Sequence, residues 1–140
     1  MRGSMTSDTE GISPEALARA LFDRLAPLVP GDLVFTRNGA RMRLTDPRGV
    51  WSEMDCRSFL ENDPEAPVDA AERASYSVLS QVQDFVTEFL TEPWPESPPE
   101  SYGLAPPEVV VNHEGIRLLY GTPSDPLLEL PSVQWTELRG

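Results

Sequence analysis

The chain has 140 residues, of which 23 are acidic and 11 basic, and its formal net charge at pH 7 is −12. This charge argues against binding to nucleic acid, because affinity for a phosphate backbone comes mainly from a basic surface. No apolar run reaches the roughly 18 residues of a membrane helix, and no signal-peptide pattern is present, so we expect a cytoplasmic protein with no membrane partner. The single cysteine, Cys56, permits no internal disulfide, which fits a reducing compartment.

Three parts of the chain are distinguished by composition. Residues 1–4, MRGS, look like the leader of an expression vector, with Met5 as the native start. Residues 5–12 are polar, and we expect them to be disordered. Residues 13–140 have a length that suits one α+β domain with a single core.

The first predicted helix begins at Ser13-Pro14-Glu15, where Ser13 can act as the N-cap and Pro14 occupies the first helical position. Leucines then recur at helical spacing, and Pro27 predicts an end near Ala26. The apolar positions are Leu17, Leu21, Leu25 and Leu28. We expect this helix to be packed against the rest of the domain.

A three-stranded antiparallel meander is predicted next, over 33–36, 40–45 and 50–54. Asn38-Gly39 is a strong hairpin signal, and the segment Asp46-Pro47-Arg48-Gly49 has the residues of a tight turn. Strand alternation should place Arg41 and Arg43 on one face of this sheet.

A long central helix is predicted from about residue 69 to about residue 92, where Pro93 prevents its continuation. Its apolar stripe contains Ala71, Ser75, Val78, Val82, Phe85 and Phe89, and it is widened by Leu79, Val86 and Leu90. One interpretation is that the stripe packs on the domain's own sheet. The other is that part of it contacts a partner, and the residues proposed for that role are Val78, Val82, Phe85, Phe89, Glu88 and Glu92.

Residues 93–107 contain six prolines and predict an extended strap across the surface. The alternative, a ligand for a proline-reading module, lacks a flanking basic residue. A hairpin over 108–112 and 116–120 follows and should complete the antiparallel sheet, giving a two-layer α+β fold. Residues 127–130 read as an edge strand, and 133–138 as either a strand or a short helical turn.

Charge is distributed unevenly along the sequence. Five arginines and three acidic residues lie between Arg37 and Arg57, whereas ten acidic residues and only Arg73 lie between Glu61 and Glu100. The favoured interpretation is that a basic sheet face pairs with an acidic helix face inside the molecule. The alternative is an acidic surface that binds another protein.

Residues for catalysis are scarce in this sequence. His113 is the only histidine and lies in a predicted turn, so a multi-histidine metal site is excluded and a dyad with Cys56 has no supporting motif. Glu53 and Asp55 share one face of a strand and, with Arg48 and Arg57 nearby, predict a surface ion-pair cluster, with a shallow carboxylate site as the alternative. We therefore predict no catalytic residue, no cofactor and no metal.

The element order of helix, meander, long helix and hairpin, together with the small size and acidity, resembles the class I chaperones of type III secretion and the YbjN-like bacterial proteins. The all-arginine basic residues also resemble those of actinobacterial proteins. The resemblance implies a dimeric α+β protein that binds extended segments of partners. The leading hypothesis is thus a non-enzymatic, homodimeric chaperone or adaptor with a protein partner. The alternatives are an acidic immunity or inhibitor protein for a basic toxin, and an enzyme with the carboxylate site.

Overall fold

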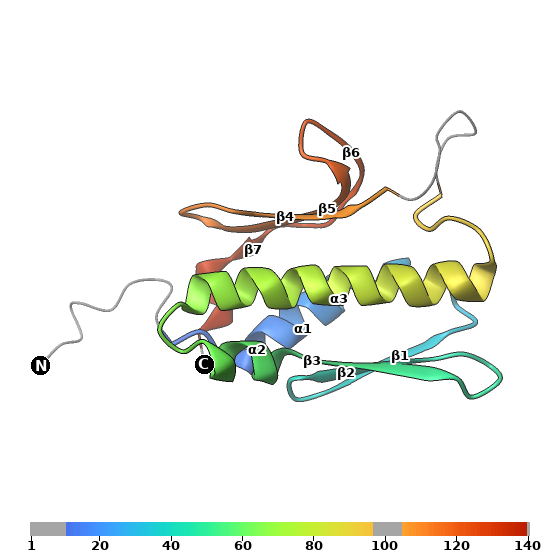
Figure 1. Ribbon diagram of the computed structural model, residues 1–140, viewed down its shortest axis with the longest axis horizontal. Helices are drawn as coiled ribbons and strands as arrows, with labels where there is room; N and C mark the ends of the chain where they lie inside the picture. Colours follow the sequence, from blue (N-terminus) through green and yellow to red (C-terminus); the bar gives the residue numbers. More distant parts are fainter. Residues whose placement is uncertain (1–10, 97–104, 140) are drawn as a thin grey trace, which may run out of the picture.

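Two antiparallel sheets enclose a layer of helices in the computed structural model, which describes residues 11–96 and 105–139. Figure 1 shows the long helix α3 between a three-stranded sheet on one side and a four-stranded sheet on the other. The first half of the chain contains α1 (Pro14–Leu25), η2 (Ala26–Leu28), β1 (Val34–Asn38), β2 (Arg41–Thr45), β3 (Trp51–Asp55), α2 (Cys56–Asn62) and α3 (Pro67–Leu90). The second half contains β4 (Pro107–Val111), β5 (Gly115–Thr122), β6 (Asp125–Glu129), β7 (Val133–Gln134) and η3 (Trp135–Leu138).

The predicted α+β class and element order are confirmed, with one difference in the sheets. The C-terminal hairpin does not complete the sheet of the meander; it belongs to a separate sheet, so the fold has three layers and not two. The reason lies in α3, whose buried surface is wider than one stripe. The buried residues of α3 are Ala70, Ala71, Ala74, Ser75, Val78, Leu79, Val82, Gln83 and Val86. A surface this wide needs cover from more than one side.

Helix α1 follows the predicted start. The Ser13 hydroxyl accepts a hydrogen bond from the Ala16 N–H at 3.1 Å, as an N-cap does. Leu17, Leu21 and Leu25 are fully buried, which confirms the predicted apolar face.

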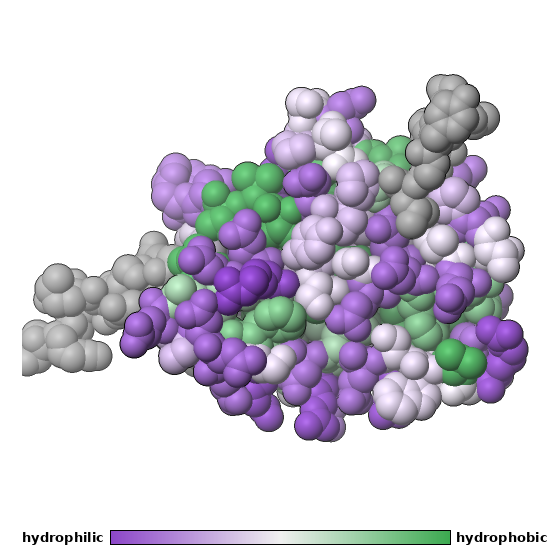
Figure 2. Space-filling view, viewed as in Figure 1, coloured by the Kyte–Doolittle hydropathy of each residue, from purple (hydrophilic) through white to green (hydrophobic). Residues whose placement is uncertain are grey.

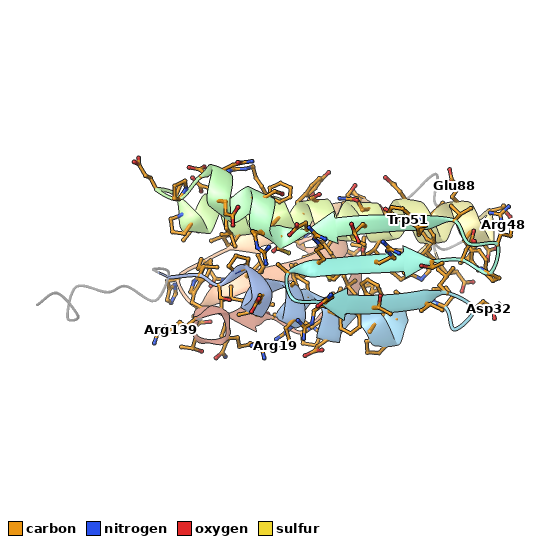
Figure 3. All side chains as sticks on the ribbon, turned by 90° about the horizontal axis from the view of Figure 1, so that it is seen from below. Arg19, Asp32, Arg48, Trp51, Glu88 and Arg139 are labelled. Atoms are coloured by element: carbon orange, nitrogen blue, oxygen red, sulfur yellow. The ribbon has the colours of Figure 1, made fainter. Side chains whose placement is uncertain are left out.

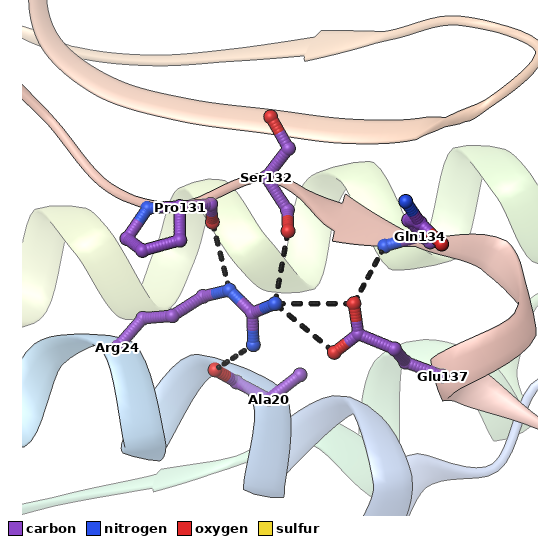
Figure 4. Close-up of polar contacts among 6 residues, drawn as sticks. All are labelled: Ala20, Arg24, Pro131, Ser132, Gln134 and Glu137. Atoms are coloured by element: carbon purple, nitrogen blue, oxygen red, sulfur yellow. Dashed lines mark hydrogen bonds and ion pairs between the residues drawn. The ribbon is translucent and has the colours of Figure 1, made fainter.

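The guanidinium of Arg24 joins α1 to the C-terminal end of the chain (Figure 4). Its Nε donates to the Pro131 carbonyl at 2.7 Å, and one terminal nitrogen donates to the Ser132 carbonyl at 2.9 Å and to Glu137 at 3.0 Å. The Glu137 carboxylate also accepts from the Gln134 N–H at 3.0 Å. Since Arg donors form a rigid planar fork, this set of bonds fixes the last segment against α1.

The meander has the predicted strands and turns. Met42, Leu44 and Met54 are buried on the inner face. The Asp46 carboxylate closes the second turn, because it accepts bonds from the N–H groups of Arg48 at 2.8 Å and Val50 at 3.0 Å. Desolvation alone would raise the pKa of Asp46, but hydrogen bonds from the Arg48 side chain and these N–H groups outweigh it and lower the pKa.

Helix α3 begins and ends two residues earlier than expected. Pro67 occupies its first turn, where the missing N–H has no cost, and Thr91 adopts a left-handed conformation (φ 57°) that stops the helix before Pro93. The helix is tied to the second sheet by the Tyr120 hydroxyl, which donates to the Leu79 carbonyl at 2.8 Å. None of the helices in the described part of the chain combines the length and the apolar character of a membrane span.

The second sheet has β5 at its centre, with β4 on one side and β6 and β7 on the other. Gly115 allows the close approach of β7, because a Cβ at this position would lie 1.9 Å from the Val133 carbonyl oxygen. The alternatives for 133–138 are both present, as the short strand β7 is followed by the helical turn η3.

Two predicted segments lie partly outside the described residues. Within 5–12, Gly11 and Ile12 are described, and Ile12 forms a β-bridge with Arg139. Within the 93–107 strap, both described ends are held by Gln83, whose amide nitrogen donates to the carbonyls of Trp94 at 3.2 Å and Ala105 at 2.6 Å.

Candidate functional site

The two residues considered for a catalytic dyad have opposite environments. Cys56 is fully buried, and burial followed by the charge of Asp55 raises the pKa of its thiol to about 12. His113 lies in the β4–β5 turn with 91% of its side chain exposed. A buried neutral thiol and a solvated imidazole do not form a nucleophile and its base.

Glu53 and Asp55 form ion pairs on the outer face of the meander. Arg43 contacts Glu53 at 3.3 Å and Arg41 contacts Asp55 at 3.4 Å, and the Arg43 guanidinium also stacks 4.3 Å from the Trp51 ring. The predicted surface ion pairs are present, but their partners are not Arg48 and Arg57, which pair with Asp46 and Glu61. Within the described residues, no group of three or more His, Cys, Asp or Glu side chains is placed to hold a metal ion.

The residues predicted to bind a partner divide between the interior and the surface. Val78 and Val82 lie in the domain's own core, with 2% and 0% of their surface exposed, so they contribute nothing to a surface. Phe85 and Phe89 are half-buried and pack against that core. Glu88 and Glu92 are exposed, Glu92 just beyond the helix.

A different part of α3 faces solvent, between the edge strands β3 and β4. Figure 3 shows that β3, which carries the labelled Trp51, is the strand of the meander that runs along α3. A hollow of about 620 Å³ lies where this surface meets β4. Its lining comprises Phe59 of α2, Glu72, Arg73, Tyr76, Ser77, Ser80 and Gln81 of α3, and Glu108 and Val109 of β4.

A second hollow, of about 320 Å³, lies on the β3 side and shares Gln81 with the first. It is lined by Val50, Trp51, Ser52, Gln81, Asp84, Phe85 and Glu88. Figure 3 shows the labelled side chains of Trp51 and Glu88 at the same end of the molecule, one from β3 and one from α3. We call the two adjoining hollows together the α3 groove.

The groove combines exposed apolar groups with acidic ones. Tyr76 and Trp51 expose 49% and 54% of their surface, which is unusual for large aromatic side chains. Figure 2 shows this face as mainly hydrophilic, with separate hydrophobic patches. Four acidic residues line the groove, namely Glu72, Asp84, Glu88 and Glu108, against one basic residue, Arg73.

The carboxylates along α3 are mostly without ion pairs. Within the described residues between Glu61 and Glu96, only Glu61 and Asp63 are paired, with Arg57 at 3.8 Å and Arg73 at 2.9 Å. The acidic residues with no ion pair to any described residue are Glu65, Asp69, Glu72, Asp84, Glu88, Glu92 and Glu96. The expected match of a basic meander with an acidic helix is therefore not found there, because Arg41, Arg43 and Arg48 pair with carboxylates of the meander itself.

Sequence reasoning missed Tyr76 and Trp51 as surface residues. Tyr76 follows Ser75 on α3 and therefore lies off the apolar stripe. This position in the helical pattern indicated that its side chain points outward. Trp51 shares a strand face with Glu53 and Asp55, and this parity indicated exposure as well.

Comparisons of the chain with protein-family models, curated proteins and solved structures gave no match. The likeness in element order to type III secretion chaperones thus identifies no family.

Proposed function

We propose that the protein is a non-enzymatic binding protein of adaptor or chaperone type, and that its α3 groove accepts a basic segment of a protein partner. The observation that carries this proposal is the row of acidic residues on α3 that have no ion pair among the described residues. Complementary charges steer association and set specificity, so a row of carboxylates without ion pairs, beside exposed aromatic groups, favours a basic partner.

The apolar side chains give the groove a means of binding beyond charge. Tyr76, Phe59 and Val109 line the larger hollow, and Trp51 lines the smaller one. Aromatic residues at the centre of an interface provide most of its binding free energy, while surrounding charges set specificity and association rate. The segment that fits this lining alternates or mixes apolar and basic residues.

The groove is unsuited to self-association through a two-fold axis. Two copies placed groove to groove would bring the acidic residues of one copy near those of the other, and like charges at an interface oppose association. The predicted homodimer remains a prediction, and it would need another surface.

The test is a titration of the protein with a fluorescein-labelled nonapeptide of alternating valine and arginine, followed by fluorescence polarisation. We expect saturable binding that weakens as salt increases, because the groove charges are exposed to solvent. The matched nonapeptide of valine and glutamate should not bind.

A pair of variants separates the groove from general electrostatic attraction. Glu72→Arg with Asp84→Arg should weaken binding of the arginine peptide by about tenfold or more, since two favourable contacts become repulsive. The control, Glu114→Arg with Asp125→Arg, changes the net charge equally at two exposed residues outside the groove, one in the β4–β5 turn and one at the start of β6. Equal weakening by both pairs would refute a binding site in the groove.

An inhibitor of a basic protein is the second candidate, and the spread of acidic residues beyond the groove favours it. Glu65, Glu92 and Glu96 lie beyond the two ends of α3 and have no ion pair among the described residues. A folded cationic partner would contact these residues too. Reversing all three would then weaken binding of that partner, whereas binding of the arginine nonapeptide would stay unchanged.

A further inference from the structure

We propose that the partner segment binds as an additional β-strand on the free edge of β4. This inference rests on the proposed function of the groove and specifies how the segment is held. It makes the main chain of the partner, and not only its charged side chains, part of the recognition.

The hydrogen bonds at the two ends of the β4–β5 ladder establish whether the main-chain N–H and C=O groups of each β4 residue point toward β5 or away from it. The Asn112 N–H donates to the Gly115 carbonyl at 3.0 Å, and the Gly121 N–H donates to the Pro106 carbonyl at 2.8 Å. Bonded pairs alternate in an antiparallel ladder, so Glu108 and Val110 direct their main-chain groups toward β5. Val109 and Val111 direct their N–H and C=O groups away from β5, toward the free edge.

Strand β4 is the end of its sheet, whose order is β4-β5-β6. No described residue outside the sheet forms a hydrogen bond with the outward N–H or C=O group of Val109 or Val111. Pro107 has no N–H, which limits the open edge at its start. The edge therefore offers a short ladder of main-chain donors and acceptors, as strand-adding sites do.

The groove lies against this edge. Val109 both belongs to the edge and lines the larger hollow, together with Tyr76 and Phe59. Since successive side chains of a strand point to opposite faces, a strand added beside β4 would direct every second side chain into the hollow. Apolar residues suit those positions, and Glu108, whose side chain lies on the opposite face of β4 from Val109, favours basic residues at the alternate positions.

The edge of β3 is the less suitable of the two. Its outward main-chain groups belong to Trp51, Glu53 and Asp55, by the alternation that the Asp46–Val50 bond fixes. Charged side chains on an edge discourage pairing with another strand. The β4 edge instead carries three consecutive valines, which favour strand pairing, beside the larger hollow.

N-methylated peptides test this mode of binding with no change in charge. In an extended valine–arginine nonapeptide, all valine N–H groups face one edge and all arginine N–H groups the other. One probe is methylated on its interior valine nitrogens and the other on its interior arginine nitrogens. Strand addition predicts that one probe binds about tenfold or more weakly than the parent, through loss of backbone hydrogen bonds, while the other stays within about threefold.

The set that is sensitive to methylation also gives the direction of the added strand, parallel or antiparallel to β4. Equal affinities of the two methylated peptides would overturn the strand-addition model. Binding of the parent peptide would still support the groove as the binding site. If the parent peptide itself fails to bind, the proposed function fails with it.

Discussion

The outer face of the meander and the α3 groove both carry many charged residues. Those on the meander form ion pairs with one another, whereas most acidic residues of the groove form none with any described residue. On the meander, Arg41 and Arg43 lie across the strands from Asp55 and Glu53, with which they are in register. In the groove, the acidic residues exceed the single Arg73, whose guanidinium is held by Asp63. A charged surface that pairs within itself has little left for a partner, so binding is expected at the groove.

This difference also shows why the charge count of a segment is a weak guide to its partners. The excess of arginine in the meander suggested a contact with the acidic helix. Strand register instead brings arginine and carboxylate side chains together within one sheet, at the short distances where ion pairs form.

The largest expected effect comes from the core that supports both surfaces. Leu79→Ala should lower the free energy of unfolding by about 2–5 kcal/mol, because it leaves a cavity under α3 at a fully buried position. Urea denaturation measures this change. The neighbouring Ser80→Ala, on the groove side, should change it by less than about 0.5 kcal/mol; similar losses for both variants would mean that α3 is not oriented as described.

A smaller effect is expected at the junction of the strap with α3. Gln83→Leu removes the donor that two carbonyls share, so we expect a loss of about 1–3 kcal/mol in the free energy of unfolding. The matched control is Gln81→Leu, because among the described residues the Gln81 side chain donates only to the nearby Ser77 hydroxyl. Thermal denaturation that ranks the two variants in the opposite order would contradict the role given to Gln83.

The smallest effects are expected when one carboxylate is neutralised on each of the two surfaces. Glu53→Gln removes a charge from an exposed ion pair and should cost less than about 1 kcal/mol in stability. It should also leave affinity for the arginine nonapeptide within about twofold of the original, since Glu53 lies outside the groove. Asp84→Asn removes the same charge from the groove and should weaken binding by about threefold. If Glu53→Gln has the larger effect in fluorescence polarisation, the comparison of the two surfaces is wrong.

The sequence was sufficient to predict the elements but not the layers. Helix caps, turn residues and periodicity are local signals, and they located α1, the meander and α3 to within a few residues. Whether the hairpin joins the sheet of the meander depends on the width of the buried surface of α3. The sequence pattern underestimates this width, because Gln83 is buried but, as a polar residue, is not counted as core. The groove was equally hidden, since it forms from Phe59, Tyr76 and Val109, which are distant in sequence.

The most direct test of the account is backbone amide chemical-shift mapping of the protein during titration with the arginine nonapeptide. The account predicts saturable shifts that cluster in residues 50–52, 72–88 and 108–111, with β1 and β2 of the meander unaffected. Shifts concentrated in residues 34–45, or spread evenly over all acidic residues, would contradict it.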